Sequence, residues 1–263
     1  MKILRSNVQW KDSFQELLDI WQEKGLCEVG QSPDRFCWVE SDKKILLHEH
    51  DRVTDLPEYD YAFFANEFHN GSNCFPWIYW PRYPRKVEAF KDKNTYKTYS
   101  QRNIESIFIG AAENPIQYVN RTRYDWSTCV EEFDFTVKLF DTNLHRYSNE
   151  EYLSKIQYSK FGLSIEGYGK KCQRDIEYMA LGVVPIFTWK SFNDYAFPLK
   201  ENVHYLYANN PREAKIKIQN CTEEQWKIMS DNCRLWYHRY CSPYFAFQVT
   251  KDLIYEKVFS SNS

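Results

Sequence analysis

The segment from 160 to 187, KFGLSIEGYGKKCQRDIEYMALGVVPIF, restricts the possible fold more than any other part of this chain. It contains a short apolar run, a polar loop with two glycines, a helical stretch and a second apolar run. Two buried strands joined through a helix form a βαβ unit, in which the strands are parallel. Gly182, just before the second run, suits the end of that helix. Because open parallel sheets bind ligands at the carboxyl ends of their strands, we predict a binding site in the loop after Ile165.

The rest of the chain beyond residue 100 also alternates strand and helix patterns. SIFIG (106–110) and FDFTVKLF (133–140) are predicted strands, and Ser148 with Glu151 forms a capping box that predicts the start of a helix. The C-terminal part is predicted to be helical, with a final amphipathic segment from Pro243 that crosses back to the first lobe. We therefore expect an α/β domain over residues 101–263, with a parallel sheet covered by helices on both faces.

The first hundred residues show a different order of elements. A helix is predicted over 12–24, where apolar residues follow a helical period. Short strands are predicted after it, at 36–40, 44–48, 61–65 and 76–80. The segment 80–102 has two prolines, many charges and little apolar periodicity, which indicates a connection between domains. We place the N-terminal, acceptor-side lobe at 1–100.

Composition and charge exclude several classes of protein. Hydrophobic residues make up 43% and aromatic residues 18% of the chain, which is typical of a globular protein rather than a disordered one. The formal net charge of −2 offers no electrostatic basis for binding nucleic acid. The sequence shows neither a signal peptide nor a run of about 20 apolar residues, so we expect a cytoplasmic protein without a transmembrane segment. The eight cysteines form no CxxC pair, which predicts reduced, packed thiols and no metal site.

Charged residues gather around the predicted binding loop. Gly167 allows the backbone to approach a ligand, and the N-terminus of the following helix favours an anion such as phosphate. Arg174 and Glu177 lie three residues apart on one helical face, so one of them can meet a diphosphate and the other ribose hydroxyls. Positive charge is added by Lys160, Lys170 and Lys171. The alternative is an ordinary βαβ unit, which also requires apolar strands, a glycine stop and a polar helix face.

The order FGLSIEG, then RDIEYMALGVVPIF, resembles the donor-binding half of GT-B glycosyltransferases, especially exostosin-like enzymes. The chain is most similar in type to the small exostosin-like transferases of large algal viruses, some of them assigned to xylose transfer. The resemblance implies two Rossmann-like lobes whose parallel sheets face a central cleft. It also implies inverting, metal-independent transfer of a sugar from a UDP-linked donor to a glycan or glycoprotein acceptor. No cofactor is implied, and the location would be the cytoplasm of an infected host cell.

The same resemblance implies roles for individual residues. Arg174 faces the nucleotide diphosphate, and Glu177 faces the ribose or the sugar. The stretch SIFIGAAENPIQYVNRTR looks like the first strand and helix of the same lobe, in which Arg121 or Arg123 corresponds to a basic residue near the diphosphate. The complete set of predicted donor-binding residues is Gly110, Arg121, Arg123, Lys160, Glu166, Gly167, Arg174 and Glu177.

Two other functions remain open at this stage. The run KFGLSIEG resembles the K-F-x-L-x-x-E-N run of α1,3-fucosyltransferases, which implies GDP-fucose as the donor. A catalytically silent carbohydrate-binding protein that keeps the fold is the third hypothesis. Nucleotide binding separates the three, because UDP supports the first hypothesis, GDP the second, and binding of neither the third.

An inverting transfer needs a base that removes the proton of the acceptor hydroxyl, and we expect the first lobe to provide it. The HEHD cluster at the end of the strand KILLH supplies the candidates Glu49, His50 and Asp51. Glu67, after the next strand, and Tyr83, between two prolines, are predicted to contact the acceptor. The alternative for HEHD is a solvated strand end. Core packing is the alternative for the aromatic residues that were also considered as sugar contacts, Trp77, Tyr79 and Trp80.

Overall fold

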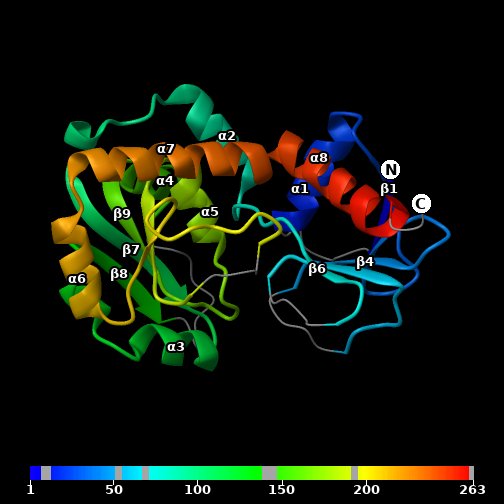
Figure 1. Ribbon diagram of the computed structural model, residues 1–263, viewed down its shortest axis with the longest axis horizontal. Helices are drawn as coiled ribbons and strands as arrows, with labels where there is room; N and C mark the ends of the chain where they lie inside the picture. The colour runs from blue at the N-terminus through cyan, green and yellow to red at the C-terminus, as the bar shows by residue number, and fades with distance from the viewer. Residues whose placement is uncertain (7–12, 51–54, 67–70, 138–146, 191–194, 261–263) are drawn as a thin grey trace. The chain divides into compact units, whose positions relative to one another are not determined.

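The computed structural model describes residues 1–6, 13–50, 55–66, 71–137, 147–190 and 195–260. The chain forms two compact units, whose elements are labelled in Figure 1. Unit 1 comprises Met1–Arg85, Asn193–Pro198 and His238–Ser263, and unit 2 comprises Lys86–Phe192 and Leu199–Tyr237. The division after Arg85 lies inside the connecting segment predicted at 80–102, and the C-terminal residues belong to unit 1.

Unit 2 contains a five-stranded sheet in which every pair of neighbouring strands is parallel. The strand order is β11-β10-β9-β7-β8. The strands are β7 (Ile104–Ala112), β8 (Glu132–Val137), β9 (Ser159–Ser164), β10 (Val184–Phe187) and β11 (Leu206–Tyr207). The chain winds outward from β7 to β8 and then in the other direction through β9, β10 and β11. The winding therefore reverses between β7 and β9, which is where open α/β sheets bind their ligands.

The helices of unit 2 begin at residues that satisfy their free backbone N–H groups. Ser148 and Glu151 form the predicted capping box of α4, and Asn114 and Asn210 cap α3 and α6. Unit 2 contains α3 (Pro115–Thr122), α4 (Asn149–Gln157), α5 (Gln173–Ala180), α6 (Pro211–Asn220), most of α2 (Pro84–Lys93) and most of α7 (Glu223–Tyr240). Short 3-10 turns lie at Tyr99–Gln101 and Trp126–Thr128. The cap of α4 confirms the helix start that Ser148 and Glu151 predict.

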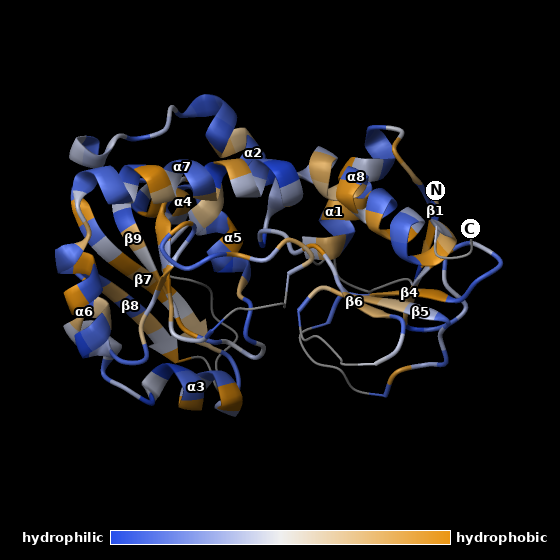
Figure 2. Cartoon of the chain, viewed as in Figure 1, coloured by the Kyte–Doolittle hydropathy of each residue, from blue (hydrophilic) through white to orange (hydrophobic). Residues whose placement is uncertain are grey.

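The core of unit 2 lies between the sheet and amphipathic helices. Phe108, Phe161 and Leu163 from the strands pack in one buried cluster with Trp226 and Met229 from α7. Figure 2 shows hydrophilic and hydrophobic residues alternating along α6 and α7. The apolar side chains of α7 are therefore buried against the sheet, as in an amphipathic helix.

Unit 1 contains a six-stranded sheet of order β2-β1-β3-β4-β5-β6. Its strands are β1 (Lys2–Arg5), β2 (Glu28–Gln31), β3 (Cys37–Val39), β4 (Ile45–His48), β5 (Tyr61–Phe64) and β6 (Cys74–Pro76). Strand β3 runs antiparallel to both of its neighbours, whereas all the other pairs are parallel. The expectation of a purely parallel sheet is therefore corrected for this unit, but β1, β4, β5 and β6 still end at one common edge. The short loop 40–44 allows the hairpin pairing of β3 with β4, since parallel neighbours need a longer crossover.

The predicted strand at 76–80 is wrong beyond its first residue. Only Pro76 belongs to β6, and the four residues after it form no strand. Trp77 is fully buried, and its indole nitrogen donates to Thr250 Oγ1 at 2.9 Å. The alternating pattern of this run thus reflects core packing, because aromatic side chains bury large areas whatever the backbone conformation.

Aromatic side chains from α1 (Ser13–Glu23) and α8 (Pro243–Ile254) build the core of unit 1. Trp21 is fully buried, and its indole nitrogen donates to the carbonyl of Pro243 at 2.7 Å. Its ring meets those of Phe14 and Phe247 edge-on, with centroids 6.5 and 5.4 Å apart. The final amphipathic segment, continued by the turn Tyr255–Phe259, therefore packs on the first helix of the chain.

The α/β class predicted from the sequence is confirmed, with two sheet-containing units and helices packed on the sheets. The GT-B arrangement of the two lobes around a cleft stays a prediction. Among the described residues, no helix is both long enough and apolar enough to cross a membrane.

Trp21 provides a test of the core of unit 1. We expect Trp21→Ala to lower the free energy of unfolding by about 3–5 kcal/mol, because it removes a buried indole and leaves a cavity. Urea unfolding followed by circular dichroism measures this change. Tyr255→Ala is the matched control, since Tyr255 is 66% exposed, and its effect should stay within about 0.5 kcal/mol. Equal effects of the two substitutions would contradict this description of the core.

Candidate functional site

The carboxyl ends of β7 and β9 carry the candidate site of unit 2. Strand β7 ends at Ala112, and β9 ends earlier in the shared register, at Ser164. Helix α5 begins at Gln173, after the polar loop that follows β9. This edge is the position that the βαβ pattern predicts for a ligand.

Arg174, in the first turn of α5, links the two strands at this edge. Its Nη1 donates to the carbonyl of Ile109 at 2.8 Å, and its Nη2 approaches the carbonyl of Ile165 at 3.5 Å. The guanidinium also lies over the ring of Phe108, 4.4 Å from the ring centroid. The residue predicted to meet a diphosphate therefore lies at the point where the sheet reverses its winding.

The guanidinium of Arg174 reaches past the end of β9. The ring of Tyr178 in α5 packs on Gly162 of β9, so α5 covers the face of the sheet to which a side chain at Gly162 would point. Gly162 pairs with Ile107 of β7, so Ile107 points to the same face. Phe108 and Gly110 lie on the opposite face, because successive residues of a strand alternate between faces. Arg174 contacts both of these residues and so extends from the face covered by α5 across the carboxyl edge.

The charge of Arg174 has no carboxylate within 4.0 Å among the residues that the structure describes. The residue is 8% exposed, and its Nε finds no hydrogen-bond partner in the described part of the chain. Burial opposes the charged form, but Tyr178, Cys172 and Asp175 nearby raise the pKa of Arg174 on balance, so the side chain stays a cation. A buried cation bonded mainly to carbonyl groups favours an anion as a further neighbour.

Gly110 is required by the position of Arg174. A Cβ atom at this position would lie 2.7 Å from Arg174 Nη1 and 2.8 Å from Phe108 Cζ. Such distances are shorter than van der Waals contact, so any side chain here would displace the guanidinium. Gly110 therefore acts by leaving room for the arginine.

Asp175 fixes the loop between β9 and α5, and the sequence analysis missed it. Its carboxylate accepts hydrogen bonds from Ser164 Oγ at 2.5 Å and from the backbone N–H of Cys172 at 3.0 Å. Burial raises the pKa of Asp175 to about 6, against the opposing effects of Arg174 and Ser164. Asp175 occupies the third position of α5, where an acidic residue can complete a capping box. The pattern is hard to recognise in the sequence because the cap residue is Cys172 and not the usual serine or threonine.

The loop itself contacts the end of α3. Asn120 Nδ2 donates to the carbonyl of Gly167 at 3.0 Å, and a Cβ at Gly167 would lie 3.1 Å from Arg121 Nη2. Arg121 is buried, whereas Arg123 is exposed. Of the two arginines considered from the sequence, Arg121 is the one that the structure brings against the loop.

Glu166 and Glu177 lie in different surroundings. Glu166 is half-buried beyond β9, and burial raises its pKa, while Lys170 and Arg123 act in the other direction. Glu177 is 3% exposed and accepts a hydrogen bond at 2.7 Å from the hydroxyl of Tyr152 in α4. Glu177 thus shares a helix with Arg174, but its described hydrogen bond is directed to α4.

Lys160 is not brought to this site, which corrects its predicted role. It lies at the start of β9, at the opposite end of the strand from Ser164. Its Nζ pairs with Glu105 at 2.7 Å and lies over the ring of Tyr99, 4.1 Å from the centroid. A strand separates its two ends by about 3.3 Å per residue, so proximity in sequence did not imply proximity to the loop.

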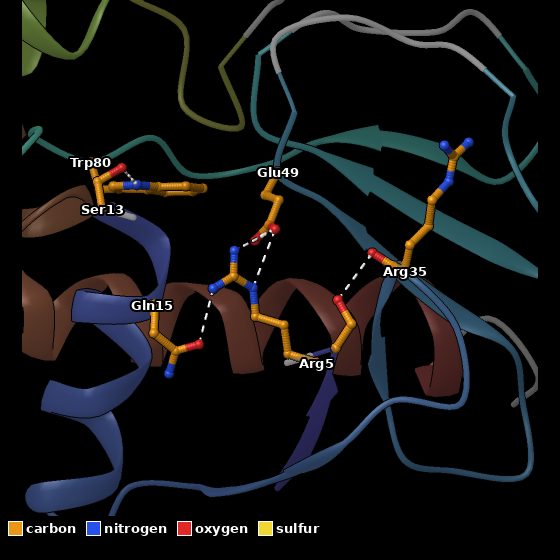
Figure 3. Close-up of polar contacts among 7 residues, drawn as sticks. Arg5, Ser13, Gln15, Arg35, Glu49 and Trp80 are labelled. Carbon is orange, nitrogen blue, oxygen red and sulfur yellow. Dashed lines mark hydrogen bonds and ion pairs between the residues drawn. The ribbon is translucent and has the colours of Figure 1, made fainter. Parts of the chain in front are cut away.

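The carboxyl edge of the sheet in unit 1 holds the second candidate site, drawn in Figure 3. Arg5, the last residue of β1, lies between Gln15 of α1 and Glu49 just after β4. Its Nη2 and Nε donate to Glu49 Oε1 at 2.6 and 3.2 Å, and its Nη1 donates to Gln15 Oε1 at 3.0 Å. The predicted base Glu49 is therefore held in a buried ion pair rather than lying on a solvated strand end.

The other residues predicted for the acceptor side are either exposed or outside the described residues. His50 is exposed, and burial together with His50 lowers the pKa of its neighbour His48 to about 4. Tyr83 is exposed and stays a prediction as an acceptor contact. Asp51 and Glu67 lie outside the described residues. The aromatic side chains considered as sugar platforms prove to be buried, which supports core packing for Trp77, Tyr79 and Trp80.

In the described ranges, no three or more His, Cys, Asp or Glu side chains gather as a metal site would require.

Among comparisons with known proteins, only the comparison with solved structures found similar proteins. No protein-family model matches the chain, and no curated protein matches it in sequence. An α1,3-fucosyltransferase solved with GDP-fucose is similar at 16% identity and a TM-score of 0.46, over 88% of this chain and 81% of the other. The wall teichoic acid polymerase TagF is similar at 12% identity and a TM-score of 0.37, over 100% of this chain and 89% of the other. Similarities at this level leave the function to be inferred from the residues of the two sites.

Gly110→Ala tests the position of Arg174. The added methyl group must displace the guanidinium, and we expect a loss of about 1–3 kcal/mol in the free energy of unfolding. This loss should be smaller in an Arg174→Ala background, because the clash with Nη1 is then absent. Urea unfolding of the two single variants and the double variant measures the coupling. Strictly additive effects would show that Gly110 does not accommodate Arg174.

Asp175→Asn tests the buried carboxyl group. The pKa of Asp175 is about 6 in the folded state, above its ordinary value of 3.8, so folding favours the protonated form. The stability contributed by this group is therefore greatest below pH 4 and falls as the pH rises to about 6, by up to about 3 kcal/mol. We expect the difference in unfolding free energy between wild type and Asp175→Asn to change in this direction between pH 4 and 7. A difference independent of pH would contradict the raised pKa.

Proposed function

We propose that the protein is a glycosyltransferase that binds the diphosphate of a nucleotide-sugar donor in unit 2. The observation that carries this proposal is the buried guanidinium of Arg174, placed where the sheet reverses its winding and without a carboxylate partner among the described residues. The N-terminus of α5 and the glycine-containing loop add backbone N–H groups at the same edge. A diphosphate supplies the negative charge that this arrangement favours.

The chemistry proposed for the donor follows from this charge. When the bond from the anomeric carbon to the diphosphate breaks, negative charge develops on the leaving oxygen. Arg174 would stabilise that charge electrostatically, with Arg121 as the second cation at the loop. This role is possible without a metal ion, because a preorganised cation in a site of low polarity acts more strongly than in water.

For the acceptor, we propose that Glu49 in unit 1 removes the proton of the attacking hydroxyl. It lies at the carboxyl edge of its sheet and is held as part of an ion pair, which favours the ionised form that a general base requires. The acceptor oxygen then bonds to the anomeric carbon, and inversion follows when attack and departure occur on opposite faces of the sugar. The proposed acceptor is a glycan or a glycoprotein.

The donor is proposed to be a UDP-sugar, and UDP-xylose is the first substrate to be tested. The resemblance of RDIEYMALGVVPIF to exostosin-like enzymes supports this choice. A second candidate is GDP-fucose, which the run KFGLSIEG supports. The two differ in the base and the sugar, whereas the diphosphate contacted by Arg174 is common to both.

Arg174→Ala is the direct test of the donor site. Loss of the cation should lower kcat by about 10²–10³-fold, as for removal of one preorganised charge-stabilising donor, and should weaken nucleotide binding. Release of UDP or GDP from a panel of nucleotide sugars measures turnover, and calorimetric titration with UDP and GDP measures binding.

Arg212→Ala serves as the matched control, because Arg212 is an exposed arginine on α6 of the same unit. We expect it to leave turnover and binding unchanged. A folded Arg174→Ala variant with wild-type nucleotide affinity would refute the assigned donor site. Absence of binding of either nucleotide by the wild-type protein would instead favour a carbohydrate-binding protein without activity.

A further inference from the structure

One carboxylate joins the two ends of the loop 165–172 in unit 2. The hydroxyl of Ser164, the last residue of β9, donates to Asp175 Oδ1 at 2.5 Å. The backbone N–H of Cys172, the cap residue of α5, donates to Asp175 Oδ2 at 3.0 Å. Each oxygen of Asp175 therefore holds a different end of the loop. We call Ser164, Asp175 and Cys172 the carboxylate clamp.

The clamp is connected to the neighbouring strands. Thr188, just after β10, donates from Oγ1 and from its backbone N–H to the carbonyl of Ser164, at 3.1 and 3.2 Å. Arg174, next to the clamp in α5, donates to the carbonyl of Ile109 in β7 at 2.8 Å. The start of α5 is thus tied to β9 and β7, and β9 is tied in turn to β10.

The middle of the loop is held by two further hydrogen bonds. The backbone N–H of Gly167 donates to the carbonyl of Gly169 at 3.1 Å, and Asn120 Nδ2 donates to the carbonyl of Gly167 at 3.0 Å. The loop therefore has bonds at its start, middle and end. Its shape is defined by the protein alone, at the N-terminus of a helix where backbone N–H groups favour an anion.

The clamp lowers the stability of the fold near neutral pH. Asp175 and Ser164 are both fully buried, and burial raises the pKa of Asp175 to about 6, although Arg174 and Ser164 act in the other direction. The ionised carboxylate is thus disfavoured in the folded protein compared with the unfolded chain. A group that reduces stability while it defines the shape of a candidate binding loop is typical of sites organised for function.

We propose that Asp175 is a positioning residue of the donor site, which holds the loop 165–172 in the shape that receives the diphosphate before the nucleotide binds. This inference rests on the proposed function and deepens it. Ordering a flexible loop costs conformational entropy, and a loop that is ordered only on binding lowers the affinity by that amount. Because Asp175 is fully buried, it acts through the loop and does not itself contact the nucleotide.

Two substitutions of Asp175 separate its hydrogen bonds from its mere presence. Asp175→Ala removes both bonds of the clamp, and the affinity for UDP or GDP should fall about 10–100-fold. Asp175→Asn has nearly the same shape, and its amide can accept from Cys172 and donate to the Ser164 hydroxyl, so affinity should stay within about threefold of wild type. Calorimetric titration at about pH 7.5, where the wild-type carboxyl group is mostly ionised, measures both values.

Two further readouts distinguish positioning from a general loss of structure. In Asp175→Ala the KM of the nucleotide sugar should rise while kcat changes little, because the loop binds substrate and transition state alike. A partly unfolded preparation would lower kcat instead, since fewer molecules are active. Hydrogen exchange followed by mass spectrometry should be about tenfold faster at 165–172 in nucleotide-free Asp175→Ala than in the wild type.

A second member of the clamp and a matched carboxylate complete the set. Ser164→Ala removes one of the two bonds of Asp175 and should weaken nucleotide binding about three- to tenfold. Glu213 occupies the same position in α6 as Asp175 in α5, and its carboxylate accepts from the backbone N–H of Asn209 at 2.9 Å. Glu213→Ala therefore removes a comparable bond outside the loop 165–172, and we expect wild-type nucleotide affinity.

The outcomes distinguish this inference from the proposed function. A folded Asp175→Ala variant with wild-type affinity, or an Asp175→Asn variant as weak as Asp175→Ala, would overturn the positioning role. The donor site would still stand if Arg174→Ala weakens binding in the same assay. Should Asp175→Ala fail to fold, equal affinities of Ser164→Ala and Glu213→Ala would overturn the role. A wild-type protein that binds neither UDP nor GDP would overturn the proposed function and this inference together.

Discussion

The hydrogen bonds of Arg174 to the carboxyl ends of two strands are the contacts on which the candidate site of unit 2 depends. The first strand of this sheet along the chain, β7, lies between β8 and β9. The chain therefore adds β8 on one side of β7 and the later strands on the other side. The guanidinium of Arg174 lies at the carboxyl edge between β7 and β9. Gly110 leaves room for it, and Asp175 fixes the loop from which its helix starts.

The two units place a buried arginine at the carboxyl edge of their sheets in opposite electrostatic situations. In unit 1, Arg5 is neutralised by Glu49 in an ion pair whose side chains are 3% and 11% exposed. In unit 2, Arg174 is bonded to backbone carbonyls, which leave its positive charge to attract an anion. The proposed function assigns Glu49 to the acceptor, as a base, and Arg174 to the leaving group, as a cation.

Arg102, another buried arginine of unit 2, has a purely structural role. Arg102 donates to the carbonyls of Lys97, Ser159 and Leu181, and so joins segments at the amino end of β9 and the C-terminus of α5. Burial, with the nearby Arg234, lowers its pKa to about 9. All three of its donor nitrogens have backbone partners, whereas Nε of Arg174 has no partner among the described residues. Arg174 also differs from Arg102 in its location, because it lies at the carboxyl edge where the winding of the sheet reverses.

The sequence by itself determined the alternation of strands and helices in unit 2, the capping box of α4, and the polar loop that joins β9 to α5. These features depend on contacts between residues close in the chain, which periodicity and capping patterns describe. Only the tertiary structure decided which side chains meet there. It placed Lys160 at the far end of its strand, paired Arg5 with Glu49 across the sheet, and reversed β3 between parallel strands. Strand pairing and the burial of charges join residues that are distant in the chain, so no local pattern specifies them.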